Sequence, residues 1–148
     1  MYHLAQLNIG KLRYPIDHPE VAEFADNLDK INALAEGSKG FVWRLKDESG
    51  NATGIKAFDD PMIIVNMSVW DTLENLKAFV YKSGHIDFLK KRNLWFENPA
   101  SAHMVLWWIK KGYIPTVQEA RLRLKELDNI GESPAAFTFK KTFVPPEK

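Results

Sequence analysis

Four short segments of the chain have residue patterns typical of β-strands: the first alternates hydrophobic and polar residues, and the others are rich in apolar and strand-forming residues. The four segments span residues 3–9, 40–46, 62–70 and 102–109. Turn-forming residues 47–51 follow the second segment, so residues 52–58 are expected to return as the second arm of a hairpin. The third segment is apolar on both faces except at Asn66 and Ser68, which predicts a sheet that is covered on each side.

Apolar residues recur at spacings of three and four in other parts of the chain, which predicts amphipathic helices. The first helix is expected after a loop over residues 10–17; its apolar stripe runs from residue 21 to residue 35, ahead of a glycine that ends it. The second spans residues 72–83 with a helical continuation over residues 85–96, and the third spans residues 116–130. Residues 137–144 predict either a short edge strand or an extended arm.

Each predicted helix begins at a residue that can cap it, with a glutamate three positions later. The three pairs are Asp17 and Glu20, Asp71 and Glu74, and Thr116 and Glu119. In such a capping box the first side chain accepts a hydrogen bond from an amide of the first turn, and the glutamate reaches back to the cap. We therefore interpret these carboxylates as caps rather than as catalytic acids.

The order of the elements is strand, helix, two strands, helix, strand, which is the βαββαβ pattern of a ferredoxin-like α+β unit. An extra C-terminal helix follows it. We expect residues 1–144 to form this single domain and residues 145–148 to form a loose tail. Because the predicted helices cover one face of the sheet, a second copy of the sheet is the simplest cover for the other face, which predicts a homodimeric α+β barrel.

The composition excludes several classes of protein. The chain has 148 residues, a net charge of +1 and no cysteine, which excludes disulfide frameworks and cysteine-based zinc sites. Its charges are mixed, so neither nucleic acid nor a membrane surface is an expected partner. We find no apolar run long enough to span a membrane and no signal peptide, so a cytoplasmic location is expected, and no metal-binding motif is present.

Several stretches of the sequence resemble an uncharacterised bacterial domain family. They are residues 66–70 (NMSVW), 74–85 (ENLKAFVYKSGH), 92–96 (RNLWF), 40–45 (GFVWRL) and 105–108 (VLWW). That family is grouped with the dimeric α+β barrels, which include the antibiotic-biosynthesis monooxygenases and the haem-degrading monooxygenases. The resemblance implies a dimeric α+β barrel and a monooxygenase-like activity.

The haem-degrading members of this superfamily line their pocket with an asparagine, a tryptophan and a histidine that is the axial iron ligand. By position, Asn8 and His85 correspond to the asparagine and the histidine. The haem-contacting tryptophan lies within a helix, where this chain has Phe79 and Tyr81, whereas Trp70 ends a strand. This departure argues against haem, so we expect no cofactor, with haem as the alternative.

His85 and Arg92 are two helical turns apart and share one face of the predicted helix. In the functional interpretation they line a pocket, with His85 as base or anchor and Arg92 holding an anionic group of the ligand. In the alternative interpretation His85 makes a local hydrogen bond and Arg92 pairs with Asp87, Glu97 or a partner chain.

Alternation along the strands predicts a small cleft with polar walls. Asn8 lies on one side of the first strand, and Asn66, Ser68 and Trp70 share one side of the third. Polar side chains on a buried face need hydrogen-bond partners, which either a ligand cavity or a hydrated dimer interface supplies. The predicted substrate-binding residues are Asn8, Trp43, Asn66, Ser68, Trp70 and Tyr81, with the two tryptophans excluding water.

Two functions remain open from the sequence. The first is a small-molecule monooxygenase-like enzyme that acts on an aromatic or polyketide-like substrate, with His85 and Arg92 as its catalytic residues. The second is a non-catalytic ligand-binding or stress-related homodimer whose polar strand residues secure the interface.

Overall fold

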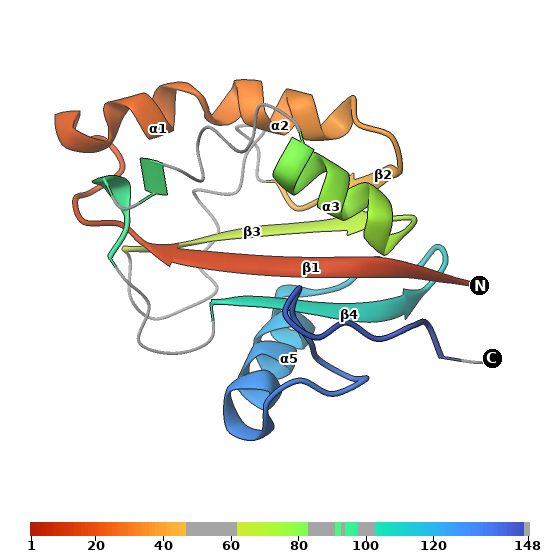
Figure 1. The fold of residues 1–148 in the computed structure, drawn as a ribbon. Coiled ribbons are helices and arrows are strands. Elements are labelled where there is room, and N and C mark those ends of the chain that lie inside the picture. Colours follow the sequence, from red (N-terminus) through yellow and green to blue (C-terminus); the bar gives the residue numbers. More distant parts are fainter. Residues whose placement is uncertain (47–61, 83–90, 93, 98–102, 147–148) are drawn as a thin grey trace.

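A four-stranded antiparallel sheet in the order β2-β3-β1-β4 forms the centre of the structure (Figure 1). The structure is a computed structural model, and it describes residues 1–46, 62–82, 91–92, 94–97 and 103–146. The strands are β1 (Tyr2–Lys11), β2 (Phe41–Arg44), β3 (Ile63–Trp70) and β4 (Met104–Lys110). The four predicted strands are confirmed, whereas the expected hairpin arm at residues 52–58 lies outside the described residues.

Helices lie on both faces of this sheet, which gives a mixed α+β fold (Figure 1). One face carries α1 (Ala22–Asp26), α2 (Leu28–Glu36) and α3 (Leu73–Lys82), and a short 3-10 turn, η1 (Pro19–Val21), leads into α1. The other face carries α5 (Val117–Ile130). The expectation that all helices cover one face is therefore wrong.

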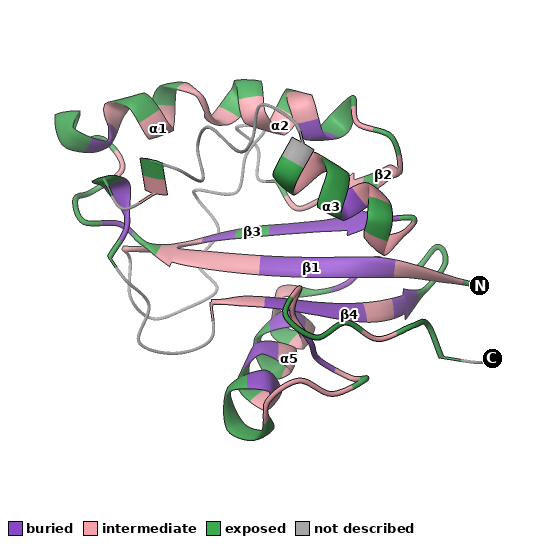
Figure 2. Ribbon diagram, in the orientation of Figure 1, coloured by how far each residue is buried: buried purple, intermediate pink, exposed green. Residues whose placement is uncertain are grey.

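The face beneath α5 is buried within the single chain (Figure 2). Ala120, Leu124 and Leu127 of α5 pack in one cluster with odd-numbered strand residues such as Leu7 and Trp107. Every strand residue of that cluster is at most 5% exposed. Since α5 and its surroundings already bury this face, the two-sided burial of β3 does not by itself require a second copy of the chain.

The predicted helix starts are correct to within one residue. Thr116 caps α5 as expected, because its side chain accepts a hydrogen bond from the amide of Glu119 at 3.1 Å. At α3 the cap is Thr72 rather than Asp71, since the Thr72 hydroxyl accepts from the Asn75 amide at 3.1 Å. At η1 the cap is the imidazole of His18 rather than Asp17.

The segment that follows α5 is an extended arm along the outer edge of β4. Phe137 and Leu106 exchange two backbone hydrogen bonds of 2.7 and 2.9 Å, which form an isolated bridge. Farther along, the indole of Trp108 donates to the carbonyl of Phe143 at 2.9 Å. Of the two sequence predictions for this segment, the extended arm is the correct one.

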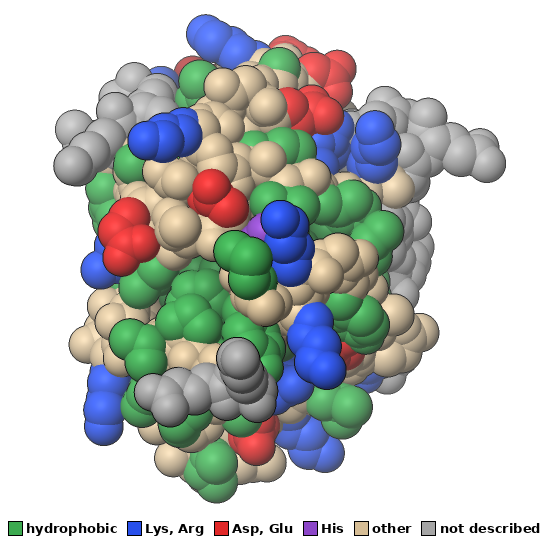
Figure 3. All heavy atoms as spheres, turned by 90° about the vertical axis from the view of Figure 1, so that its right-hand side faces the viewer, with side chains coloured by type: hydrophobic (Ala, Val, Ile, Leu, Met, Phe, Trp, Pro, Cys, Tyr) green, Lys and Arg blue, Asp and Glu red, His purple; other side chains and the backbone are tan. Residues whose placement is uncertain are grey.

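Charged side chains are distributed on the surface as the composition suggests. On the side shown in Figure 3, lysine and arginine side chains lie among acidic, apolar and other residues and do not gather into one basic patch. Among the described residues, no helix has the length and apolar character that crossing a membrane would require.

Candidate functional site

Polar side chains of β1 and β3 meet in the middle of the face that α2 and α3 cover. Gln6 lies opposite Ser68 in the register of the two strands, and Asn8 lies opposite Asn66. A cavity of about 50 Å³ lies above them, which is room for a water molecule or a small polar group. Its lining residues are Gln6, Asn8, Ile31, Asn32, Ala35, Arg44, Asn66, Ser68, Leu76, Phe79 and Val80.

The floor of this cleft is a hydrogen-bonded network. The amide nitrogen of Gln6 donates to Asn66 Oδ1 at 2.7 Å and to Ser68 Oγ at 2.8 Å. The indole nitrogen of Trp70 also donates to Ser68 Oγ, at 2.9 Å. Gln6 and Ser68 are the two polar residues among the described ones that are buried, and these bonds account for their burial.

The wall of the cleft is apolar and comes from two helices. Helix α2 contributes Ile31, Asn32 and Ala35, and α3 contributes Leu76, Phe79 and Val80. In each helix the three positions fall within one turn, so they face the sheet together. The cleft thus combines a hydrogen-bonding floor with a largely hydrocarbon wall, as small-molecule sites do.

Trp70 supports the cleft from below and does not line it. Its side chain is fully buried, and its ring stacks on Phe79 with the ring centres 5.2 Å apart. Phe41 packs edge-on against the same indole at 5.6 Å. Trp70 therefore fixes Phe79 through ring contact and Ser68 through its indole N–H.

Trp43 lies on the opposite face of the sheet from the cleft, contrary to expectation. The pairing of β2 with β3 shifts between Phe41 and Trp43, as at a β-bulge, so that Trp43 pairs with Val69. Trp43 consequently packs with the cluster beneath α5. The shift reverses the alternation that the sequence predicts from Phe41 onward.

The same shift turns Arg44 toward the cleft, opposite Ser68. The side chain of Arg44 is only 11% exposed, and its Nε lies 3.7 Å from Glu36 Oε2. That separation is an ion pair but too long for a hydrogen bond. Arg44 thus brings a cation, largely withdrawn from water, to the edge of the polar floor.

Two further predicted site residues, Tyr81 and Arg92, are not among the residues that line the cleft. Tyr81 is 49% exposed on α3, and its ring packs against Phe139 of the C-terminal arm, with the ring centres 5.7 Å apart. The guanidinium of Arg92 lies over the ring of Phe96, 5.4 Å from its centre. His85 is outside the described residues.

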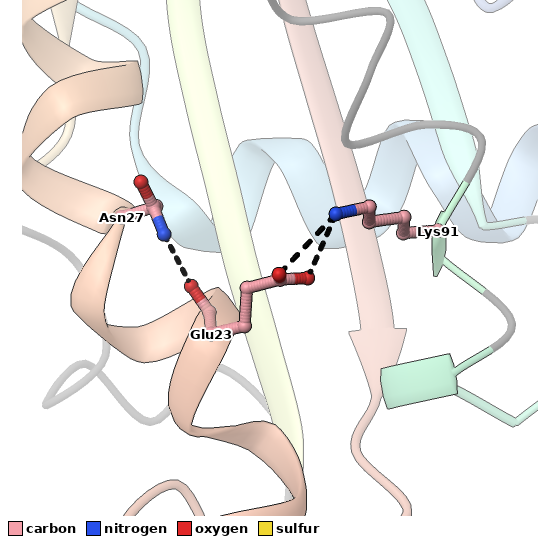
Figure 4. A network of polar contacts seen from close by, with 3 residues as sticks. All are labelled: Glu23, Asn27 and Lys91. Atoms are coloured by element: carbon pink, nitrogen blue, oxygen red, sulfur yellow. Dashed lines mark hydrogen bonds and ion pairs between the residues drawn. The ribbon is translucent and has the colours of Figure 1, made fainter.

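Both sequence interpretations of Arg92 stay predictions, because His85 and Asp87 lie outside the described residues. The neighbouring Lys91 pairs with Glu23 of α1, at 3.2 Å to each carboxylate oxygen, and Asn27 donates to the Glu23 carbonyl at 2.8 Å (Figure 4). Burial lowers the pKa of Arg92. The pKa of His103, ahead of β4, is lowered by burial first and then by the charges of Arg92 and Lys140, which keeps its imidazole neutral near pH 7.

Of the predicted site residues, the structure brings Asn8, Asn66 and Ser68 together in the cleft. The other lining residues were not predicted as site residues, among them Gln6, Asn32, Arg44 and Phe79. Asn32 could have been found from its spacing, since it stands three residues before Ala35 on the apolar stripe of its helix. No local signal in the sequence identifies Arg44, because its orientation depends on the bulge.

The chemistry of the lining residues is that of hydrogen bonding and one positive charge. Among the described lining residues there is no carboxylate, histidine or cysteine, the side chains that bind transition metals. Nowhere among the described residues do three or more histidine, cysteine, aspartate or glutamate side chains come together as a possible metal site. The cleft is therefore suited to an organic ligand that carries hydrogen-bond acceptors.

Comparison with known proteins gives a family and two structural neighbours. No curated protein matches the chain. The crystal structure of NE2512, a protein of unknown function from Nitrosomonas europaea, is similar over 78% of this chain and 95% of that chain, with 14% identity and a TM-score of 0.49. The crystal structure of PA3566 from Pseudomonas aeruginosa is similar over 76% of this chain and 97% of that chain, with 10% identity and a TM-score of 0.50, a likeness of fold alone.

The family assignment rests on nearly the whole sequence. A model of one family matches residues 3–148, a range that includes every residue that lines the cleft and all of the four strands except Tyr2. The chain belongs to the family described as Domain of unknown function (DUF3291).

Proposed function

We propose that this chain is a monooxygenase-like enzyme that binds an electron-rich aromatic or polyketide-like compound in the cleft between the sheet and helices α2 and α3. The observation that carries the proposal is the pairing of the buried Gln6–Ser68 floor with the apolar wall around Phe79. Burial of a polar side chain costs free energy, so a sheet face that only closed an apolar core would be expected to carry apolar residues at positions 6 and 68. The polar end of the ligand would enter the cavity, and its ring would lie at the mouth against Phe79.

The proposed reaction needs no reductant. A CH₂ group conjugated to a phenol loses a proton, reacts with dioxygen and becomes a carbonyl group. One oxygen atom stays in the product, the other leaves as water with the two hydrogens, and the substrate supplies all four electrons. The protein's part is to hold the anionic form of the substrate in a site with little water. His85, which shares a predicted helix face with Arg92, is the proposed base or anchor, so a His85→Ala variant with unchanged turnover would contradict that role.

Haem is a poor fit to the described cleft. The cavity of about 50 Å³ has room for the polar end of a ligand but not for a macrocycle, which would have to enter it whole to reach an axial ligand. None of the described lining residues is a histidine that could serve as axial ligand. Haem titration checks this directly: no shift of the Soret band is expected.

The finer description of the fold is also a proposal, namely a ferredoxin-like unit that pairs into a homodimeric α+β barrel. The strand order β2-β3-β1-β4, with helices between β1 and β2 and between β3 and β4, supports the first part. The resemblance of the sequence supports the second part. Light scattering should give the mass of two chains, and the mass of one chain would contradict the dimer.

A second candidate is non-catalytic binding of the same class of ligand. The observation in its favour is that Arg44, a permanent cation, is the one ionisable side chain among the described lining residues. The described lining residues can therefore bind an anionic ligand through hydrogen bonds and charge, but none of them is a base that would take a proton from a substrate.

Oxygen uptake with a panel of hydroxylated aromatics, anthrones and quinols separates the two candidates. The test uses a matched pair of variants on α2: Ala35→Leu fills the cleft, whereas Ala33→Leu adds the same atoms at an exposed position. Uptake by the wild type and by Ala33→Leu, with loss in Ala35→Leu, is the expected result. Absence of uptake with every compound, together with binding that Ala35→Leu abolishes, would favour the non-catalytic candidate.

A further inference from the structure

The hydroxyl of Ser68 is set to donate a hydrogen bond into the cleft. A serine hydroxyl has two acceptor lone pairs and one hydrogen. The two lone pairs of Ser68 accept from Gln6 Nε2 at 2.8 Å and from Trp70 Nε1 at 2.9 Å. Within the part of the chain that the structure describes, no side chain accepts the remaining hydrogen. A ligand oxygen above Ser68 would supply that acceptor.

Arg44 stands beside this hydroxyl. It is the cross-strand partner of Ser68, and side chains at such positions on one face of a sheet start about 5 Å apart. Both side chains line the cavity. Glu36, which is 43% exposed, lies 3.7 Å from Arg44 Nε and balances its charge as an ion pair that is too long for a hydrogen bond. An anionic group in the cleft would meet a cation and a hydroxyl donor together.

The two donors have different origins in the fold. The β-bulge in β2 brings Arg44 to the cleft face, and the buried network around Gln6 and Trp70 fixes the direction of the Ser68 hydroxyl. Because Ser68 accepts the N–H of the fully buried Trp70, the core holds its hydroxyl in place before any ligand binds. The two donors, Arg44 and Ser68, thus lie opposite each other in the strand register, and both line the cleft.

We propose that Arg44 and Ser68 form a subsite for a negatively charged oxygen of the ligand, a carboxylate, phenolate or enolate, and so make the cleft selective for anionic compounds. This inference rests on the proposed function, because it assumes that the cleft binds an aromatic compound. Beyond the proposed function, we infer that the ligand is negatively charged and that Arg44 and Ser68 recognise this charge. Charge-assisted hydrogen bonds to arginine are stronger than neutral ones, so the preference for an anion should be about tenfold or more.

Two probes of the same shape test the subsite, 2-hydroxybenzoate with its negative charge and neutral 2-hydroxybenzamide. Their affinities are measured at pH 7 by ligand-observed NMR titration with the wild type and three variants. In Arg44→Gln the acid and the amide should bind with about equal affinity. Arg44→Lys, which keeps the charge, should retain part of it. Arg121→Gln, the same change on α5 across the sheet, should leave it unaltered.

The ratio of the two affinities is insensitive to partial unfolding, because a poorly folded variant loses both ligands together. Equal affinity of the wild type for acid and amide, with both lost in Ala35→Leu, would overturn the subsite while the proposed cleft stands. A preference for the acid that survives Arg44→Gln would also overturn it. If the wild type binds neither compound at millimolar concentration, both the subsite and the proposed aromatic ligand are wrong.

Discussion

Replacing Ser68 by alanine should expose the dependence of Trp70 on its single hydrogen-bond acceptor. The indole of Trp70 is fully buried and donates to Ser68 Oγ at 2.9 Å. In Ser68→Ala this N–H loses its acceptor, whereas Gln6 keeps its bond to Asn66 at 2.7 Å. An unsatisfied buried donor costs about 1–3 kcal/mol, and at this chain length each kcal/mol lowers Tm by roughly 2–4 °C.

A double-mutant cycle separates this cost from general damage to the fold. Trp70→Phe removes the N–H but keeps an aromatic ring, so in that background Ser68→Ala should cost about 1 kcal/mol less of the free energy of unfolding. Urea denaturation followed by circular dichroism gives the four values. Ser133→Ala, on the far side of the sheet, is the control and should show no coupling with Trp70→Phe. If Ser68→Ala and Trp70→Phe are additive within about 0.5 kcal/mol, the indole bond does not stabilise the floor of the cleft.

Three further predictions concern the region beyond the cleft. Gly10→Ala should lower the free energy of unfolding by about 1–3 kcal/mol, because the added Cβ would stand 2.5 Å from the buried ring of Phe96. Gly37→Ala is the control: the atom nearest to its added Cβ is 3.5 Å away, so the free energy of unfolding should change little. Arg92→Gln should raise the pKa of His103, measured by NMR titration, and an unchanged pKa would contradict the charge interaction. Because the folded pKa of His103 is lowered, the unfolded chain binds more protons just below pH 6.5, so stability should fall as the pH drops through that value, and less so in His103→Gln.

The fold could be predicted from the sequence where a local pattern decides the outcome. Strand alternation identified β3 and the shared side of Asn66 and Ser68, and helical spacing identified α5 up to Gly131. Cap positions were correct only to one residue, because Asp71 and Thr72 are both good caps and the backbone geometry chooses between them. Such choices depend on dihedral angles that the residue types do not determine.

Other features of the site could not be predicted because they depend on contacts distant in the sequence. The shift between Phe41 and Trp43 depends on the pairing of β2 with β3, and it exchanges the faces on which Trp43 and Arg44 lie. The position of α5 on the opposite face of the sheet is likewise a matter of tertiary packing. Alternation alone therefore placed a tryptophan where the structure has an arginine.

The most direct test of the central claim, that the cleft beneath α2 and α3 is a ligand site, uses the side-chain amides of that cleft. Addition of 2-hydroxybenzoate to ¹⁵N-labelled protein should shift the side-chain amide resonances of Asn8 and Asn66, which line the cavity. Those of Asn27, between α1 and α2, and of Gln118 on α5 should stay in place, because neither residue lines the cavity. Shifts confined to Gln118 and its neighbours, or no shift at saturating ligand, would contradict the account.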